Sequence, residues 1–262
     1  MAGIIIGAIM LALGALLAIL VPLKIKNKNL EIRFMQTTAI SELKGILESN
    51  KAAGLEGYRH YVELKGMAAS EIPLKAPFSG KDVAYYSADL YQVYEEKKIT
   101  TDKSGTNQTI KNNEALMTSE KSSEPVIIKE PGSSDDVHID ISQSGIQLDS
   151  MQTLNKFEPL ANLKDYSYFS NYRYNAMGVR TLGFKLVERT IPIGQQLYAL
   201  GEARLDNGKI MMGRPLDSKL PFIVSVRDKN DIIKGNKTGA NVALVFGILI
   251  AIAGILLMIF VK

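Results

Sequence analysis

The sequence contains no cysteine and no tryptophan, and only two histidines among its 262 residues. Without cysteine the chain cannot form a disulfide, a cysteine-bound zinc site or an iron–sulfur cluster, and it has no thiol nucleophile. Two histidines cannot supply a three-histidine metal site. Gly-rich phosphate loops and the Gly-x-Ser-x-Gly and His-Glu-x-x-His motifs are also missing. We therefore expect no cofactor and assign no catalytic residue.

Charged side chains are missing from two long segments, one at each end of the sequence. Residues 1–23 carry none, and residues 240–261 carry none before Lys262. Each segment can cross a hydrocarbon core of about 30 Å at about 1.5 Å per residue. We predict two transmembrane helices with these bounds. A cleaved signal peptide is the alternative for the first, but it lacks a basic start and its apolar run is too long.

Small residues recur at helical spacing in both spans. Such residues let helix backbones approach closely in lipid, so the spans could pack on each other or on a second chain. A high content of Gly and Ala is also common in membrane helices, and the spacing does not separate these readings. The residues assigned to contact with another membrane protein or to self-association are Gly3, Gly7, Ala243, Gly247 and Ala251.

The formal charge is +4, from 31 Lys and Arg against 27 Asp and Glu. The basic residues that flank the two spans on the side of the central region are Lys24, Lys26, Lys28, Arg33, Arg227, Lys229, Lys234 and Lys237. The other side has only the N-terminal amine and Lys262. The positive-inside rule therefore places the central region in the cytoplasm. The residues expected to touch the lipid bilayer itself are Lys24, Lys26, Lys28, Lys234 and Lys237.

No basic run with interleaved aromatic residues is present, so we expect no nucleic-acid partner. After the first span, residues 24–56 form the expected juxtamembrane segment. An apolar stripe predicts a helix from Leu30 to Asn50, begun by Thr37 or Thr38 and followed by Gly54. The stripe consists of Ile40, Leu43, Ile46 and Leu47.

Residues 57–230 have the pattern of a β-rich domain. Short alternating segments separated by turn residues predict a mainly antiparallel domain, and an OB-like barrel is one closed form that fits. Asp206-Asn207-Gly208 predicts a hairpin. The polar stretch 99–124 reads as a flexible loop between strands. The predicted strands are 58–64, 83–94, 125–129, 137–141, 172–174, 184–191, 196–200, 209–212 and 221–226. The fold class is thus an α+β membrane protein, with two transmembrane helices flanking the β domain and one amphipathic helix.

Asp136, His138 and Asp140 alternate along one predicted strand and would share one face. Two carboxylates and an imidazole are weak candidates for a metal site, or for a membrane-bound enzyme. The simpler interpretation makes them the solvent face of a strand whose buried face is Val137 and Ile139. A Tyr-rich segment is the expected interaction surface, through Tyr85, Tyr86 and Tyr91.

The order of span, helix, β domain and span, together with several sequence segments in the predicted strands, resembles the GIDE family. These segments include Gly57–Gly66, Ile191-Pro192-Ile193-Gly194 and Leu200-Gly201-Glu202-Ala203. The best-known members are mitochondrial MULAN-type and chloroplast RING ligases, in which a beside-a-membrane domain lies between two spans. The resemblance implies E3 ubiquitin-ligase activity carried by a RING after the second span. A RING needs two zinc sites built largely of cysteine, and this sequence has none.

The resemblance also implies that the domain faces an intermembrane space, which conflicts with the charge argument. We expect a RING-less member in a prokaryotic cell membrane, with the β domain in the cytoplasm. Its expected function is a non-catalytic protein- or membrane-interaction module. The alternatives are an enzyme using Asp136, His138 and Asp140, or a scaffold in a ubiquitin-ligase-like pathway.

Overall fold

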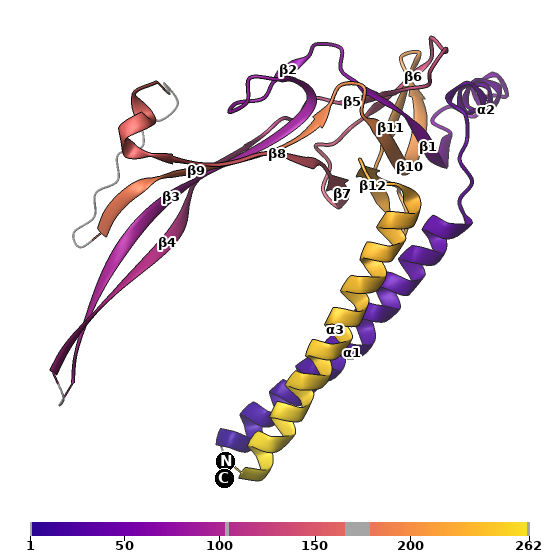
Figure 1. Cartoon of the computed structure of the whole chain (residues 1–262). Coiled ribbons are helices and arrows are strands. Elements are labelled where there is room, and N and C mark those ends of the chain that lie inside the picture. The colour runs from indigo at the N-terminus through magenta and orange to yellow at the C-terminus, as the bar shows by residue number, and fades with distance from the viewer. Residues whose placement is uncertain (1, 103–104, 166–178, 261–262) are drawn as a thin grey trace.

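The computed structural model describes residues 2–102, 105–165 and 179–260. Two long helices, α1 (Ala2–Phe34) and α3 (Lys229–Phe260), run side by side in opposite directions, and a β-rich body lies at one end of the pair (Figure 1). Both chain termini lie together at the other end. Within the described residues these are the two helices long and apolar enough to cross a membrane.

Close contact between α1 and α3 depends on glycines. A Cβ added to Gly14 would lie 2.5 Å from the carbonyl oxygen of Gly247, and one added to Gly7 would lie 2.5 Å from that of Gly254. Real Cβ atoms do not approach so closely, so these positions allow the backbones to touch. Gly7 and Gly247, two of the small residues predicted to lie at a helix contact, therefore lie at the contact between α1 and α3 of one chain.

Five strands close into a barrel. They are β1 (Arg59–Ala69), β5 (Val126–Lys129), β6 (Asp136–Ile139), β11 (Lys209–Gly213) and β10 (Gln196–Asp206), in that spatial order. The ring closes because β1 pairs with both β5 and β10. All pairs are antiparallel except β6 with β11. Numbered along the chain, the order is first, second, third, fifth, fourth, which is that of an OB-type Greek-key barrel.

Two further strands extend this sheet: β12 (Phe222–Ser225) pairs with β10, and β7 (Ile146–Asp149) pairs with β12. The predicted hairpin at Asp206-Asn207-Gly208 is confirmed. It joins β10 to β11, and Asn207 and Gly208 both have positive φ, as a type I′ turn requires.

The barrel core is closed by helix α2 (Ile40–Ala52), whose buried Ile40, Leu43 and Leu47 join the same cluster as the barrel interior. The expected single helix from Leu30 to Asn50 needs correction, because α1 continues to Phe34 and a break precedes α2. Thr37 and Thr38 do not cap α2, which starts after Ala39. Instead the carboxylate of Glu130, from the β5–β6 loop, accepts the Ile40 N–H. Thr37 pairs with the edge of the barrel at Glu63.

A second sheet, called the arm below, projects away from the barrel (Figure 1). Its strands are β2 (Leu74–Lys75), β3 (Asp82–Asp102), β4 (Gly105–Lys121), β8 (Met151–Pro159) and β9 (Val179–Pro192). β3 lies between β9 and β4, β8 lies outside β9, and the short 3₁₀ helix η1 (Leu160–Asp165) follows β8. The arm has its own small core of Leu90, Phe184 and Leu186.

The expected flexible loop over 99–124 is wrong. Residues 99–102 and 105–121 pair as parts of β3 and β4, with partners from Ser87–Lys121 out to Asp102–Gly105. Thr and Ile favour extended backbone, but no described side chain of β4 is buried, so no buried stripe reveals the strand. The predicted strand at 172–174 lies outside the described residues.

Candidate functional site

Both helices continue as helix beyond their uncharged segments, and these extensions support the barrel. Residues 24–34 of α1 and 229–239 of α3 form this stalk. Each extension is about 16 Å long at about 1.5 Å per residue. A headgroup layer is roughly 5–7 Å thick on each side of the hydrocarbon. With the uncharged segments in a bilayer, the first turns of the stalk therefore lie among the lipid headgroups, and the barrel lies above them.

A buried polar joint connects the stalk to the barrel. Glu63 of β1 is 1% exposed, and its carboxylate lies 2.8 Å from Nζ of Lys229 at the start of α3. The hydroxyls of Thr37 and Tyr198 donate to the same carboxylate, at 2.7 and 3.1 Å. Burial and the nearby Glu63 charge raise the pKa of the Tyr198 phenol, so this hydroxyl stays a donor.

Apolar packing surrounds this joint. Ile32 from α1 and Ile232 from α3 are buried against Tyr198, Leu200 and Ile223 of the barrel. Lys229 Nζ also donates to the carbonyl oxygen of Met35, 2.5 Å away, where α1 ends. The helices and the barrel therefore meet through a packed, hydrogen-bonded interface rather than through free linkers.

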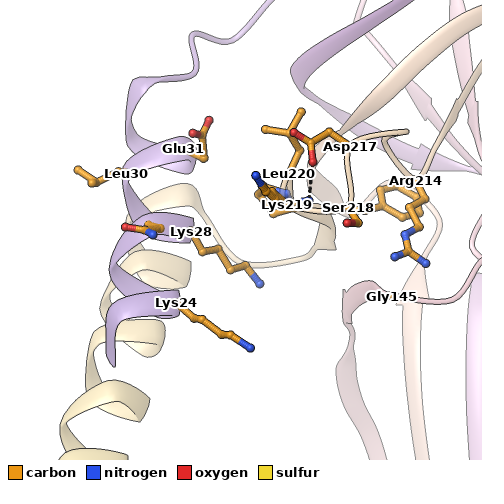
Figure 2. A pocket seen from close by; sticks show the side chains of 13 residues that line it. Lys24, Lys28, Leu30, Glu31, Gly145, Arg214, Asp217, Ser218, Lys219 and Leu220 are labelled. Atoms are coloured by element: carbon orange, nitrogen blue, oxygen red, sulfur yellow. Dashed lines mark hydrogen bonds between the residues drawn. The ribbon is translucent and has the colours of Figure 1, made fainter. Parts of the chain in front are cut away.

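A basic pocket opens between the stalk and the barrel (Figure 2). Its volume is about 800 Å³. One wall is α1, which contributes Lys24, Lys28 and Glu31, and the other is the loop between β11 and β12 with Gly145 of the β6–β7 loop. The β11–β12 loop contributes Arg214, Asp217, Ser218 and Lys219. Four cations thus face two carboxylates in one cavity.

The arm presents an exposed row of side chains that crosses four strands. The pairings Leu116–Tyr91, Tyr91–Lys185 and Lys185–Phe157 place these residues directly opposite one another, so they lie on one face. Leu116 is 55% exposed and Phe157 is 47% exposed. Lys185 Nζ lies 5.8 Å from the Tyr91 ring centroid. We call Leu116, Tyr91, Lys185 and Phe157 the outer row.

Local structure explains why the outer row stays exposed. The opposite face of β3 and β9 carries Leu90, Phe184 and Leu186, which form the arm core. Because side chains alternate along a strand, burying that face leaves the outer row toward solvent. The Phe157 ring lies over Gly183, where any added Cβ would come within 2.8 Å of it. The absence of a side chain at Gly183 therefore leaves space for the Phe157 ring.

The structure separates the three predicted tyrosines. Tyr85 is 6% exposed and belongs to the barrel core, so its expected place on an interaction surface is wrong. Tyr86 and Tyr91 point to opposite faces, because they are five positions, an odd number, apart on a strand that pairs regularly with β9. Tyr86 donates to the Glu120 carboxylate at 2.8 Å. Of the three, Tyr91 is the one in the outer row.

The candidate metal site is likewise divided. His138 is 6% exposed, rather than on a solvent face, and its Nε2 lies 3.3 Å from an Asp136 oxygen. β6 ends at Ile139, so Asp140 does not continue the alternation. Asp140 instead accepts hydrogen bonds from the Ser142 N–H and hydroxyl and from the Gln143 side chain. No group of three His, Asp or Glu side chains suited to a metal occurs among the described residues.

The flanking lysines fall into separate environments. Lys24 and Lys28 line the basic pocket, whereas Lys26 and Lys237 line a smaller groove of about 300 Å³ between α1 and α3. Lys234 lies 3.8 Å from Asp231 on the same helix. Sequence reasoning missed the pocket partners Arg214 and Lys219 and the buried Glu63–Lys229 pair. Their only local signals are ordinary charges in loops and strands, since the fold alone brings them together.

Comparison with known proteins gives one match. A family model named GIDE and described as E3 ubiquitin ligase matches residues 95–259. This range covers β4, β8 and β9 of the arm with the end of β3, all barrel strands except β1, and nearly all of α3. No curated protein and no solved structure matches the chain.

Proposed function

Because the chain belongs to the GIDE family, whose model is described as E3 ubiquitin ligase, and has no cysteine, we propose that it is a non-catalytic, membrane-anchored interaction module. A RING would require cysteine-bound zinc, which this sequence cannot supply. In this proposal α1 and α3 cross the membrane, the joint holds the barrel above it, and the arm contacts a protein partner. The exposed outer row is the observation that carries the proposal.

The outer row has the composition expected of a small binding surface. Aromatic and aliphatic anchors with a cation among them are the residues that dominate protein interfaces. Leu116 and Phe157 expose large apolar side chains at the two edges of the row, with Tyr91 and Lys185 between them. Four strands spaced about 4.8 Å apart make the row about 14 Å wide, enough for the centre of an interface.

The proposed partner is another protein at the same membrane. Anchoring at both ends keeps the arm close to the bilayer, which raises its effective concentration for membrane-bound partners. The proposed location is the cytoplasmic side of a prokaryotic cell membrane, and the flanking basic residues support this sidedness through the positive-inside rule.

Site-specific photo-crosslinking in cells tests this function. A photoreactive amino acid at position 116 should form a discrete adduct, and Phe157→Ser should abolish or strongly reduce it. The matched control carries the photoreactive residue at Ile72, an apolar side chain that is 77% exposed and lies outside the outer row. Equal adducts from positions 116 and 72, both insensitive to Phe157→Ser, would exclude the outer row as the contact surface.

The family description also favours a second candidate, a scaffold that recruits a separate RING protein. Its distinguishing outcome is the identity of the crosslinked partner. An adduct with a RING-containing protein supports the scaffold, and an adduct with any other membrane protein supports the general interaction module.

A further inference from the structure

The basic pocket combines a position and a charge pattern that the interaction function does not use. Figure 2 shows Lys24 and Lys28 extending from α1 toward the cavity, with Arg214 across from them and Glu31 and Asp217 toward its upper end. Lys24 and Lys28 are four residues apart, so they share one face of the helix. These two lysines therefore lie at the end of the pocket that is nearer the apolar segment of α1.

These cations have no close carboxylate partner, although Asp149, which lies 2.5 Å from Arg227, acts on Lys28 from farther away. Among the described residues, no carboxylate lies within 4 Å of the charged nitrogens of Lys24, Lys28, Arg214 or Lys219. Elsewhere on the surface basic side chains do find carboxylates, as in the Lys44–Asp135 pair at 2.7 Å. Like charges that converge without a counter-charge repel one another, and a bound anion removes that cost.

Two of the four cations are held in place before any ligand arrives. Lys28 Nζ donates to the side-chain oxygen of Gln147 at 2.5 Å. Arg214 donates to the backbone oxygen and hydroxyl of Ser144, at 3.4 and 3.2 Å. Gly145, with φ of +84°, has no Cβ, and an added one would lie 3.4 Å from the Arg214 guanidinium carbon. The positive φ is what favours glycine here, and an added Cβ at that distance would make only an ordinary contact with Arg214.

The two carboxylates do not cancel this arrangement. One oxygen of Asp217 accepts the Lys219 N–H at 2.9 Å and so fixes the turn of the loop. Glu31 lies almost two helical turns beyond Lys24, toward the barrel (Figure 2). Both acids therefore border the upper end of the pocket and leave its lower end positive.

We propose that the lower end of this pocket binds a phosphate group, supplied by the headgroup of an anionic phospholipid whose acyl chains remain in the bilayer beside α1. Arg and Lys are the side chains best suited to phosphate oxygens. The lipid source rests on membrane insertion under the proposed function. A soluble phosphate ester has the same chemistry and is the other source that the test separates.

The test uses the full chain purified in a neutral detergent. Native mass spectrometry follows binding of short-chain phosphatidylglycerol, with phosphatidylcholine of the same chain length as the neutral lipid. The variant Lys28→Gln/Arg214→Gln removes two pocket cations. It should bind phosphatidylglycerol about 25-fold more weakly, since each cation near an anionic headgroup changes affinity roughly fivefold. The matched control Lys51→Gln/Lys81→Gln removes the same charge from exposed positions of the β-rich body that do not line the pocket, and it should change affinity less than about twofold.

A third variant, Lys28→Arg/Arg214→Lys, keeps both charges and should retain most of the binding, which guards against simple misfolding. Inorganic phosphate and glycerol 3-phosphate are titrated in the same assay. Binding of these soluble probes, but not of the lipid, with loss in Lys28→Gln/Arg214→Gln would support a phosphate site with a soluble ligand. Equal losses in the pocket and control variants, or no binding of any probe, would overturn the proposal. Failure of the chain to insert into bilayers would instead overturn the proposed function.

Discussion

The barrel and the arm are both built of antiparallel strands, yet they solve the problem of burying a sheet differently. The barrel closes on itself, is covered by α2, and contains an extended cluster of buried side chains. The arm stays open, and its described core contains three fully buried apolar residues. The closed sheet has no free edge along its ring, whereas β4 of the arm pairs only with β3 among the described strands.

The two sheets therefore differ in role: the barrel is attached to the membrane helices, and the arm exposes the outer row. The barrel is attached to both helices through Glu63, Lys229 and the apolar residues around them, so it is the rigid base. The arm carries the outer row away from that base and has a smaller buried core to stabilise it. Local opening occurs most easily where buried contacts are few, so the arm should be the more dynamic sheet.

Breaking the joint should give the largest effect. Lys229→Met removes the cation beside the buried Glu63 carboxylate and should destabilise the barrel by about 3–5 kcal/mol. Thermal unfolding of the detergent-solubilised chain measures this loss. Lys234→Met is the matched control, because Lys234 is exposed, and it should cost less than about 0.5 kcal/mol. Equal effects of the two substitutions would show that the joint does not hold the barrel.

Two leucine-to-alanine substitutions compare the stability of the barrel directly with that of the arm. Leu64 in the barrel and Leu90 in the arm are both 0% exposed. Each change to Ala should cost about 2–5 kcal/mol in the sheet that contains it. Hydrogen exchange should show that Leu64→Ala loosens barrel and arm together, whereas Leu90→Ala loosens the arm alone. Loss of barrel protection in Leu90→Ala would mean that the two sheets unfold as one unit.

A third substitution tests the helix pair that carries both sheets. Gly14→Leu places a side chain against the backbone of Gly247 and should weaken α1–α3 packing by about 1–3 kcal/mol. A short bis-maleimide crosslink between cysteines at Ala18 and Ala251, which both line the contact between the two helices, reports whether α1 and α3 remain side by side. Gly239→Leu is the control, because a Cβ there meets no atom within 4 Å. Unchanged crosslinking in Gly14→Leu would contradict the packing.

The smallest predicted effect concerns the stability of the barrel at acidic pH. Although burial raises the pKa of Asp140, hydrogen bonds from Ser142 and Gln143 outweigh it and hold the pKa below the ordinary 3.8. A lowered folded-state pKa adds stability that is complete above 3.8 and is lost as the pH falls through the folded value. Asp140→Asn should therefore reduce the acid sensitivity of barrel unfolding by about a few tenths of a kcal/mol, since solvent screens this half-buried group. A steeper acid dependence in the variant would contradict this assignment.

Features with a local signal could be predicted from the sequence. The uncharged segments gave the long helices, alternation gave the barrel strands, and Asn207-Gly208 gave a hairpin turn. The β3–β4 hairpin escaped prediction because no described side chain of β4 is buried. Tyr85 escaped because the choice of which strand face enters the barrel depends on distant strands. The Glu63–Lys229 pair and the meeting of Lys28 with Arg214 depend on the finished topology, which no local pattern records.

Sidedness tests the account most directly, and the absence of cysteine makes the experiment clean. Two variants each carry one thiol, at Ser123→Cys in an exposed part of the β domain or at Lys262→Cys beyond α3. Intact cells are treated with a membrane-impermeant maleimide, and permeabilised cells show that both thiols can react. The account predicts labelling of the Lys262→Cys protein alone, with the barrel and arm in the cytoplasm. Labelling of the Ser123→Cys protein alone would place the domain outside and contradict the charge argument on which its proposed location rests.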